Sequence, residues 1–253
     1  SNGFIHKTAE VVTPLPNMAD VIASKSNADM YNRLLERYCA PYPDREGSMT
    51  RQYNYEFDAN VDTVFTKRFF SEKSQGGLSL IQTPAGKAVN GTLKYDPAWN
   101  AYYAGLNDQG GNIALQKDMA VMMVPSDEAM RNYWEEGAGK VLRDYYGSWD
   151  NVPDDVISKL INVNMLSSFI SSVPSKFDNI LNDANDPMGV DVADIDSVWL
   201  ACNGAIYLTN KVYSPTAYIS VSFPALINET MRILYWGIEQ LQYDVYLNSL
   251  NTY

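Results

Sequence analysis

The amino-acid sequence predicts an α+β fold, because helix-forming and strand-forming segments occupy separate stretches of one chain. Apolar residues recur at helical intervals near both ends of the chain and over 126–182. Alternating or short apolar runs bounded by Gly and Pro occupy 44–111 and 198–213 instead. Hydrophobic residues make up 46% of the 253 residues and charged residues 19%, so we expect a folded domain with a substantial core.

The first helical pattern spans 15–42. It begins at Pro16, carries apolar residues at helical spacing along one face, and ends at Pro41. The polar run 24–27 interrupts the pattern. We therefore expect two short helices here rather than one.

The stretch 44–111 has few helical periods and reads as strands and loops. Tyr53–Phe57 alternates aromatic and polar residues, and 61–69 alternates in part, which predicts strands. Asn90-Gly91 is a dipeptide favoured in two-residue hairpin turns, because both turn positions need positive φ. This region is therefore expected to be rich in β-hairpins.

A buried strand followed at once by a helix is predicted next. Met119–Val124 is a short apolar run that Pro125 ends, too short for a helix. Ser126 or Asp127 can cap the following helix, and acidic residues in the first turn suit the helix dipole. Further helices are predicted over 140–146, 153–169 and 174–182.

A hairpin and a long helix are predicted to complete the chain. Two apolar runs flank Asn203-Gly204, which indicates a tight turn between two strands. From Pro224 to Leu250 the helical pattern is continuous, with an apolar stripe too wide for a helix standing in water. Its aromatic residues are Tyr235, Trp236, Tyr243 and Tyr246. We expect a partner to cover this stripe, through self-association of the C-terminal helix or through a following module.

Composition excludes several classes of function. The 19 basic and 30 acidic residues give a net charge of −11, which disfavours nucleic acid as a partner. His6 is the single histidine, so the usual routes to metal binding and to acid–base catalysis at neutral pH are missing. No apolar run approaches the ~20 residues of a transmembrane helix. We expect no catalytic residues, no metal, no cofactor and no transmembrane segment in this chain.

Two sets of side chains that could bind a metal ion have simpler structural interpretations. Cys39 and Cys202 have no metal-binding spacing and are expected to be small buried hydrophobes, with a disulfide between them as the alternative. The acidic stretch 183–196 offers oxygen ligands for calcium. Pro187 stands where an EF-hand loop needs a ligand, so an ordinary solvated loop is favoured.

An aromatic cluster within 44–116 is the best candidate for ligand binding. It comprises Tyr95, Trp99, Tyr102 and Tyr103. Aromatic rings offer a large contact area with few torsions to immobilise, which suits sugars and protein surfaces alike. The structural alternative is that these rings pack the region onto its own domain.

Two segments resemble the signature boxes of the fasciclin domain, an extracellular adhesion module. Val121–Met130 is similar to the box in which an apolar strand runs into Pro-Ser/Thr-Asp-Glu-Ala. Cys202–Pro215 is similar to the box with Asn-Gly, an apolar strand, Asn-x-Val and Pro. Many fasciclin domains carry a Tyr-His pair after the central helix. Here Val163 and Asn164 stand at that place, so integrin binding through such a pair is not implied.

The resemblance implies a fasciclin-type β-wedge and a domain organisation. We expect an N-terminal tail over 1–15, a fasciclin-like domain over 16–222 with a β-rich insertion at about 44–116, and a C-terminal helical segment over 223–253. That last segment is similar to the opening helix of a second fasciclin module. The Tyr-rich composition and the insertion make the chain similar to surface lipoproteins of Bacteroidetes. This resemblance implies an extracellular or cell-surface protein, lipid-anchored through a removed N-terminal region.

The expected function is that of a non-enzymatic adhesion or ligand-binding module for a surface protein or glycan. Two alternatives stay open. One is a carbohydrate-active enzyme that uses an Asp/Glu pair, which a convergent pair of carboxylates with a raised pKa would favour. The other is an architectural spacer, which would lack any exposed aromatic surface on the insertion.

Overall fold

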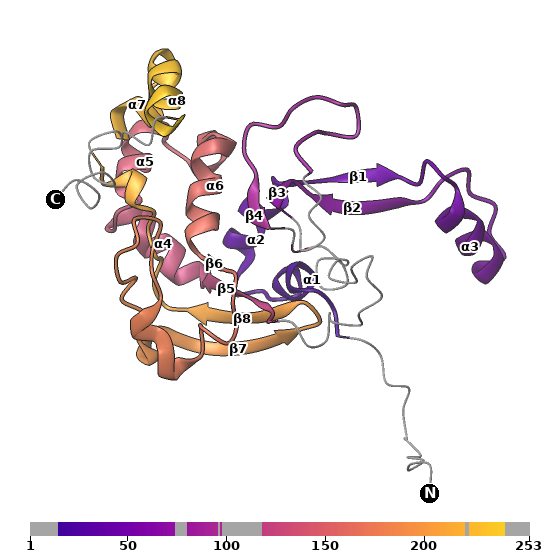
Figure 1. The fold of residues 1–253 in the computed structure, drawn as a ribbon, viewed down its shortest axis with the longest axis horizontal. Coiled ribbons are helices and arrows are strands. Elements are labelled where there is room, and N and C mark those ends of the chain that lie inside the picture. The colour runs from indigo at the N-terminus through magenta and orange to yellow at the C-terminus, as the bar shows by residue number, and fades with distance from the viewer. Residues whose placement is uncertain (1–14, 74–79, 96, 98–117, 221–222, 241–253) are drawn as a thin grey trace, which may run out of the picture.

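The computed structural model describes residues 15–73, 80–95, 97, 118–220 and 223–240 (Figure 1). Helices and strands in these ranges confirm the predicted α+β class. The helices and the insertion are arranged around a central sheet.

The central sheet has four strands in the order β6-β5-β8-β7. Its members are β5 (Ala120–Pro125), β6 (Met165–Leu166), β7 (Ile195–Ala201) and β8 (Gly204–Thr209). The two middle strands, β5 and β8, run parallel, while β6 and β7 pair antiparallel at the edges. Every residue of β5 and β8 is buried, as expected of strands covered on both faces. The predicted strand and hairpin are confirmed. The turn is shifted by one residue from the predicted Asn203-Gly204: Cys202 and Asn203 form it, and Gly204 is the first residue of β8.

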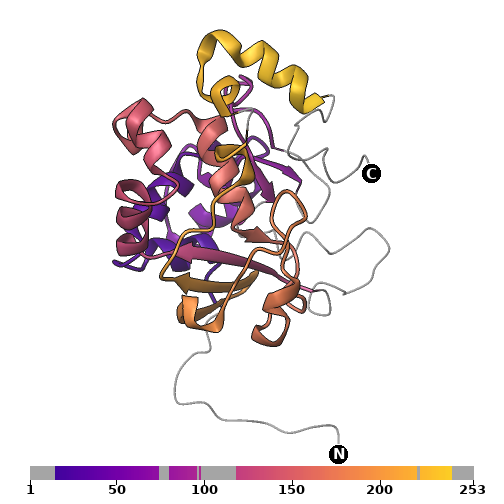
Figure 2. The same ribbon diagram turned by 90° about the vertical axis from the view of Figure 1, so that its left-hand side faces the viewer.

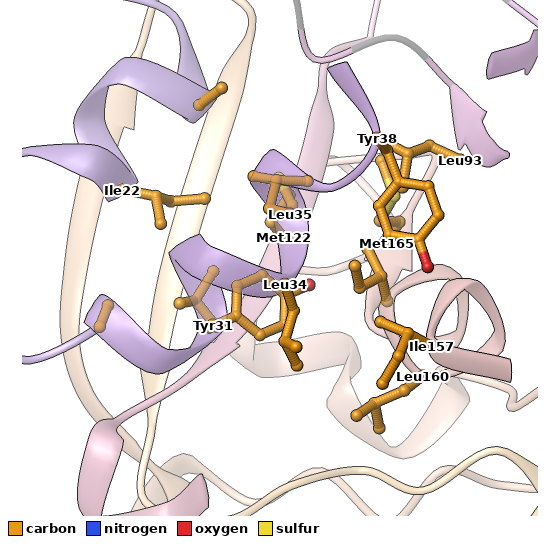
Figure 3. Packing of buried hydrophobic residues seen from close by; sticks show 14 of the residues in the cluster. Ile22, Tyr31, Leu34, Leu35, Tyr38, Leu93, Met122, Ile157, Leu160 and Met165 are labelled. Carbon is orange, nitrogen blue, oxygen red and sulfur yellow. The ribbon is translucent and has the colours of Figure 1, made fainter. Parts of the chain in front are cut away.

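Helices cover one face of this sheet. They are α1 (Met18–Ala23), α2 (Asp29–Glu36), α4 (Asp127–Glu135), α5 (Lys140–Tyr146), the 3-10 helix η3 (Trp149–Asn151) and α6 (Asp154–Val163). Met122 of β5 belongs to the larger core, together with Ile22, Leu35 and Ile157 (Figure 3). Alternate residues such as Met123 and Tyr207 point to the opposite face, into a smaller core with Phe177. Two 3-10 helices lie in the segment over that face, η4 (Pro174–Asn179) and η5 (Val192–Asp194).

The helix boundaries follow local capping. The Oγ of Ser126 accepts a hydrogen bond from the Ala129 N–H at 3.2 Å, which confirms its predicted role as the α4 cap. The predicted break between α1 and α2 is also confirmed, but the helical pattern predicted as far as 42 is wrong at its end, because α2 stops at Glu36 and Cys39–Pro43 is a strand. The helix predicted over 153–169 is too long: α6 ends at Val163, and the chain enters β6 two residues later. The helix predicted over 174–182 is a shorter 3-10 helix, η4.

The insertion forms an arm and a second small sheet. The arm, defined here as residues 39–69, consists of the antiparallel strands β1 (Cys39–Pro43) and β2 (Phe65–Phe69) joined through α3 (Ser48–Phe57). It points away from the rest of the molecule, with α3 at its tip (Figure 1). At the base, β3 (Ser71–Lys73) pairs in parallel with β4 (Leu93–Tyr95).

The strand predicted at Tyr53–Phe57 is wrong, because this segment is the second half of α3. The Asp44 carboxylate accepts hydrogen bonds from the Thr50 N–H at 2.8 Å and the Thr50 hydroxyl at 2.9 Å, inside the first turn. Gly47, at φ +70°, provides the left-handed turn that leads into the helix. Period-two alternation predicts a strand only where one face is buried, and α3 has no covering layer.

The hairpin predicted at Asn90-Gly91 is also wrong. The turn lies earlier, where the Thr83 N–H donates to the Lys87 carbonyl at 2.8 Å. Gly91 instead lies against the start of α6, at φ +147°, where an added Cβ would stand 2.7 Å from the Asp154 carbonyl oxygen. The glycine therefore serves close backbone packing, which lets Leu93 enter the core (Figure 3).

The single helix predicted over 224–250 is wrong in the described part. The chain forms the 3-10 helix η6 (Thr216–Tyr218), α7 (Phe223–Ile227), the 3-10 helix η7 (Glu229–Met231) and α8 (Arg232–Gln240). Asn228 interrupts the pattern, because its side-chain oxygen accepts from the Thr230 N–H and hydroxyl at 3.0 and 2.7 Å. Leu226 of α7 is buried in the main core, and α8 runs across the top of the molecule (Figure 2). Residues 241–253 lie outside the described part, and within it no helix is long and apolar enough to cross a membrane.

Candidate binding surface

The predicted aromatic cluster falls largely outside the described residues. Trp99, Tyr102 and Tyr103 lie there, and Tyr95 is the last residue of β4, paired with Lys73. The backbone beside it is held firmly. Asn162 of α6 accepts from the Lys94 N–H at 2.7 Å and donates to the Thr92 carbonyl at 3.0 Å. The assignment of these four aromatic residues to ligand binding therefore stays a prediction.

The arm presents a different aromatic surface, which was not predicted. Tyr55 is 89% exposed, Phe57 65% and Phe65 60%. The Tyr53 and Phe57 rings lie side by side on α3, with centroids 4.8 Å apart. Thr50 is the one residue of α3 that is buried. Exposed rings gathered on a projecting element are typical of an interaction surface rather than of a core.

The base of the arm is anchored on the body, by which we mean the central sheet and the helices that cover it. Phe69 and Phe70 are buried in the main core beside Tyr38. Lys67 of β2 forms an ion pair with Glu36 at the end of α2. The hydroxyl of Tyr42 in β1 donates to the Gln82 carbonyl, and Arg45, which follows β1, donates to the Pro84 carbonyl at 3.0 Å. The arm is thus fixed at its base while its tip stands in solvent.

The arm carries charges of both signs in similar number. Residues 39–69 hold five acidic and four basic side chains, a net charge of −1, which is close to their proportional share of the chain's −11. At the tip, the backbone N–H of Thr50 lowers the pKa of Asp44, so this carboxylate stays ionised and caps α3.

Several carboxylates outside the arm have structural partners. Burial raises the pKa of Asp20, an effect that the Lys67 ammonium opposes. The Asp20 carboxylate accepts a hydrogen bond from the Asn17 amide at 2.8 Å. The Asp183 carboxylate accepts from the Thr216 N–H at 3.0 Å, and Asp191 and Asp194 form a capping box around η5. Among the residues that the structure describes, no group of three or more His, Cys, Asp or Glu side chains could hold a metal ion.

The two cysteines are free thiols, not a disulfide. Both are partly exposed, so the expectation of fully buried side chains is wrong. The Cys39 thiol contacts the Glu36 carbonyl at 3.2 Å, and burial, with the nearby Glu36 carboxylate, raises its pKa to about 11. A thiol with a raised pKa is a poor nucleophile at neutral pH.

The site at which many fasciclin domains carry a Tyr-His pair is buried here. Val163 and Asn164 lie in the interior, and the Asn164 amide donates to the carbonyls of Leu160 and Tyr213, each at 2.8 Å. Asn164 therefore joins the end of α6 to the chain that follows β8. It offers no surface to a ligand.

Comparison with known proteins gives no match: no family model, no curated protein and no solved structure is similar to this chain. The function must therefore be argued from the residues themselves.

The sequence contained one signal that pointed to the arm. Met49, Arg51, Gln52 and Glu56 are good helix formers, and β-branched residues are nearly absent from 48–57. A helix there places Tyr53 and Phe57 on one side and Tyr55 on another. Without a neighbouring sheet to bury them, these rings must face solvent.

Proposed function

We propose that this chain is a non-enzymatic adhesion or ligand-binding module of fasciclin type, and that the tip of the arm contacts its ligand. The observation that carries the proposal is the set of exposed aromatic side chains on α3 and β2, chiefly Tyr55, Phe57 and Phe65. Solvent exposure of such rings costs free energy, which binding of a partner would recover.

The proposed ligand is a surface protein or a glycan. Aromatic faces stack on sugar rings and fill pockets on proteins, so both ligands suit the exposed rings of the arm. The chain charge of −11 disfavours nucleic acid. A cell-surface location with a lipid anchor is part of the same proposal and rests on the resemblance to surface lipoproteins.

The arrangement of the two boxes supports the fasciclin type. The first box contributes β5 and α4, the second contributes β8, and β5 and β8 are parallel neighbours. The Ser126 N–H of the first box donates to the Thr209 carbonyl of the second at 2.9 Å. The two segments that resemble the family signatures thus pack as one unit.

An array of glycans and extracellular matrix proteins tests the proposal. Wild type should give reproducible ligands, and a Tyr53→Ser, Tyr55→Ser, Phe57→Ser variant should lose them while keeping its melting temperature. The matched control changes Ile233, Leu234 and Trp236 of α8 to Ser, since these apolar residues are also exposed. Equal binding by wild type and the arm variant would contradict the proposal. Turnover of an oligosaccharide on the array would favour the enzyme alternative instead.

A further inference from the structure

The two edges of the central sheet differ in length and composition. One edge is β6, which has only two residues, and a short edge strand offers little to a pairing partner. The opposite edge is β7, which has seven residues and no proline. In Figure 1, β7 lies at the lower boundary of the sheet, beyond β8. Such a strand is a template for pairing unless something covers it.

The hairpin pairing determines which backbone groups of β7 are open. Ala201 and Gly204 close the two-residue turn, so they form a hydrogen-bonded pair, and such pairs alternate along the ladder. Val198 and Leu200 fall between these pairs and direct their N–H and C=O groups away from β8. Among the described residues, no backbone hydrogen bond to another segment reaches these groups. In the described part of the N-terminal chain, the backbone hydrogen bond to the hairpin lies at its turn, where the Cys202 N–H donates to the Pro16 carbonyl at 2.9 Å.

The side chains of the same two residues are also uncovered. Val198 is 53% exposed and Leu200 61%, and both lie on the face of the sheet that carries Tyr207 and Ala205. The other face of β7 is occupied, since the Lys25 ammonium lies 5.0 Å from the Trp199 ring centroid. Asp196 is the only charged residue of β7. Open backbone groups and exposed apolar side chains thus coincide at two positions.

We infer that β7 pairs antiparallel with β7 of a second copy of this chain, across a twofold axis, to join two sheets into one. The strand is self-complementary: in the register centred on Trp199, Val198 of each copy faces Leu200 of the other. This register leaves the two Asp196 carboxylates away from each other. Since each copy carries −11, a contact is least opposed where charges are few, as they are along β7. This inference concerns a surface other than the arm and does not depend on the proposed ligand.

Analytical ultracentrifugation of the full chain over a concentration series tests the pairing. Wild type should shift from the mass of one 28.4 kDa chain to twice that mass. A Val198→Lys, Leu200→Lys variant should raise the dimer dissociation constant by roughly tenfold or more, because like charges would face each other in the pair. Circular dichroism and the melting temperature check that this variant folds. The matched control, Ile233→Lys with Leu234→Lys on α8, should dimerise as wild type does.

Residue-level hydrogen exchange distinguishes strand pairing from any other dimer. The Val198 and Leu200 amides should exchange fast in the dilute monomer and slowly in the dimer, whereas a contact through side chains alone would leave them fast. A wild type that stays monomeric at every concentration would overturn the inference. So would a dimer that the α8 variant abolishes, or one in which these two amides remain unprotected.

Discussion

The arm and the body of this molecule use their residues in opposite ways. In the body, β5 and β8 bury every residue, and polar side chains such as Asn164 and Arg37 connect distant segments. In the arm, α3 buries Thr50 alone and exposes aromatic rings. The contrast shows which changes should unfold the chain and which should alter only its contacts. The predictions below begin with the largest expected effect.

Gly204→Ala should give the largest loss of stability. An added Cβ would stand 2.3 Å from the Ala120 carbonyl oxygen and 2.7 Å from the Met18 sulfur, and backbone cannot move aside cheaply inside a packed sheet. We expect a loss of about 3 kcal/mol or more in the free energy of unfolding, measured by urea titration. Tyr55→Ala on the arm should change it by less than about 0.5 kcal/mol. Comparable losses in the free energy of unfolding for both variants would contradict the proposed difference between body and arm.

Arg37→Ala should be the next most damaging change. The guanidinium forms an ion pair with Asp154 at 2.6 Å and donates to the Val152 carbonyl at 2.6 Å and the Trp149 carbonyl at 3.2 Å. Its removal leaves those carbonyls without a donor, which should cost about 1–3 kcal/mol in urea unfolding. The exposed Arg33 of α2, the helix that Arg37 directly follows, provides the control, and Arg33→Ala should be nearly neutral. An Arg37 variant as stable as the Arg33 variant would show that the Arg37 side chain does not stabilise the fold.

Ser126→Ala combined with Asp127→Ala should lower stability moderately and leave binding intact. Ser126 caps α4, and the Asp127 carboxylate accepts from the Met30 N–H at 2.8 Å, which joins α4 to α2. We expect a loss of about 1–2 kcal/mol in thermal or urea unfolding. The folded fraction should bind any array ligand as wild type does. A loss of binding without a loss of stability would instead assign these residues a part in ligand contact.

Acid should loosen the tip of the arm through Asp44. Hydrogen bonds from Thr50 lower the pKa of this carboxyl in the folded chain, so its cap is complete above the unfolded pKa of about 4. The cap is lost as the pH falls through the lower folded value. The amide signal of Thr50, followed by NMR from pH 7 downward, should report this change locally. An Asp44→Asn variant should show no such transition, and an identical transition in both chains would point to another group.

The sequence predicted the elements whose signals were local and in agreement. An apolar run that Pro125 ends, followed by a Ser cap and two acids, permits few structures other than β5 and α4. The hairpin of β7 and β8 was predictable for the same reason. These elements define the core of the body.

The remaining elements depended on contacts that a sequence pattern does not reveal. Asn90-Gly91 is a dipeptide typical of hairpin turns. Here, however, Gly91 is needed because the backbone at the start of α6 lies too close for a side chain. The alternation at Tyr53–Phe57 suits a strand, but no layer covers it, and the Asp44 cap favours a helix. Similarly, the Asn228 side chain accepts a hydrogen bond from the Thr230 N–H and so divides an apolar stripe that is continuous in the sequence. The aromatic surface on α3 was missed because its rings were assigned to a sheet face.

Excision of the arm tip tests the central claim most directly. Asp44 and Val64 are joined by a backbone hydrogen bond of 3.0 Å from the Asp44 N–H, so Asn-Gly in place of 45–63 can close β1 and β2 as a hairpin. The shortened chain should unfold at the temperature of wild type and lose only the helical signal of α3. It should also lose binding to the ligands that wild type gives on the array. A shortened chain that fails to fold, or that binds those ligands as strongly as wild type, would contradict the account.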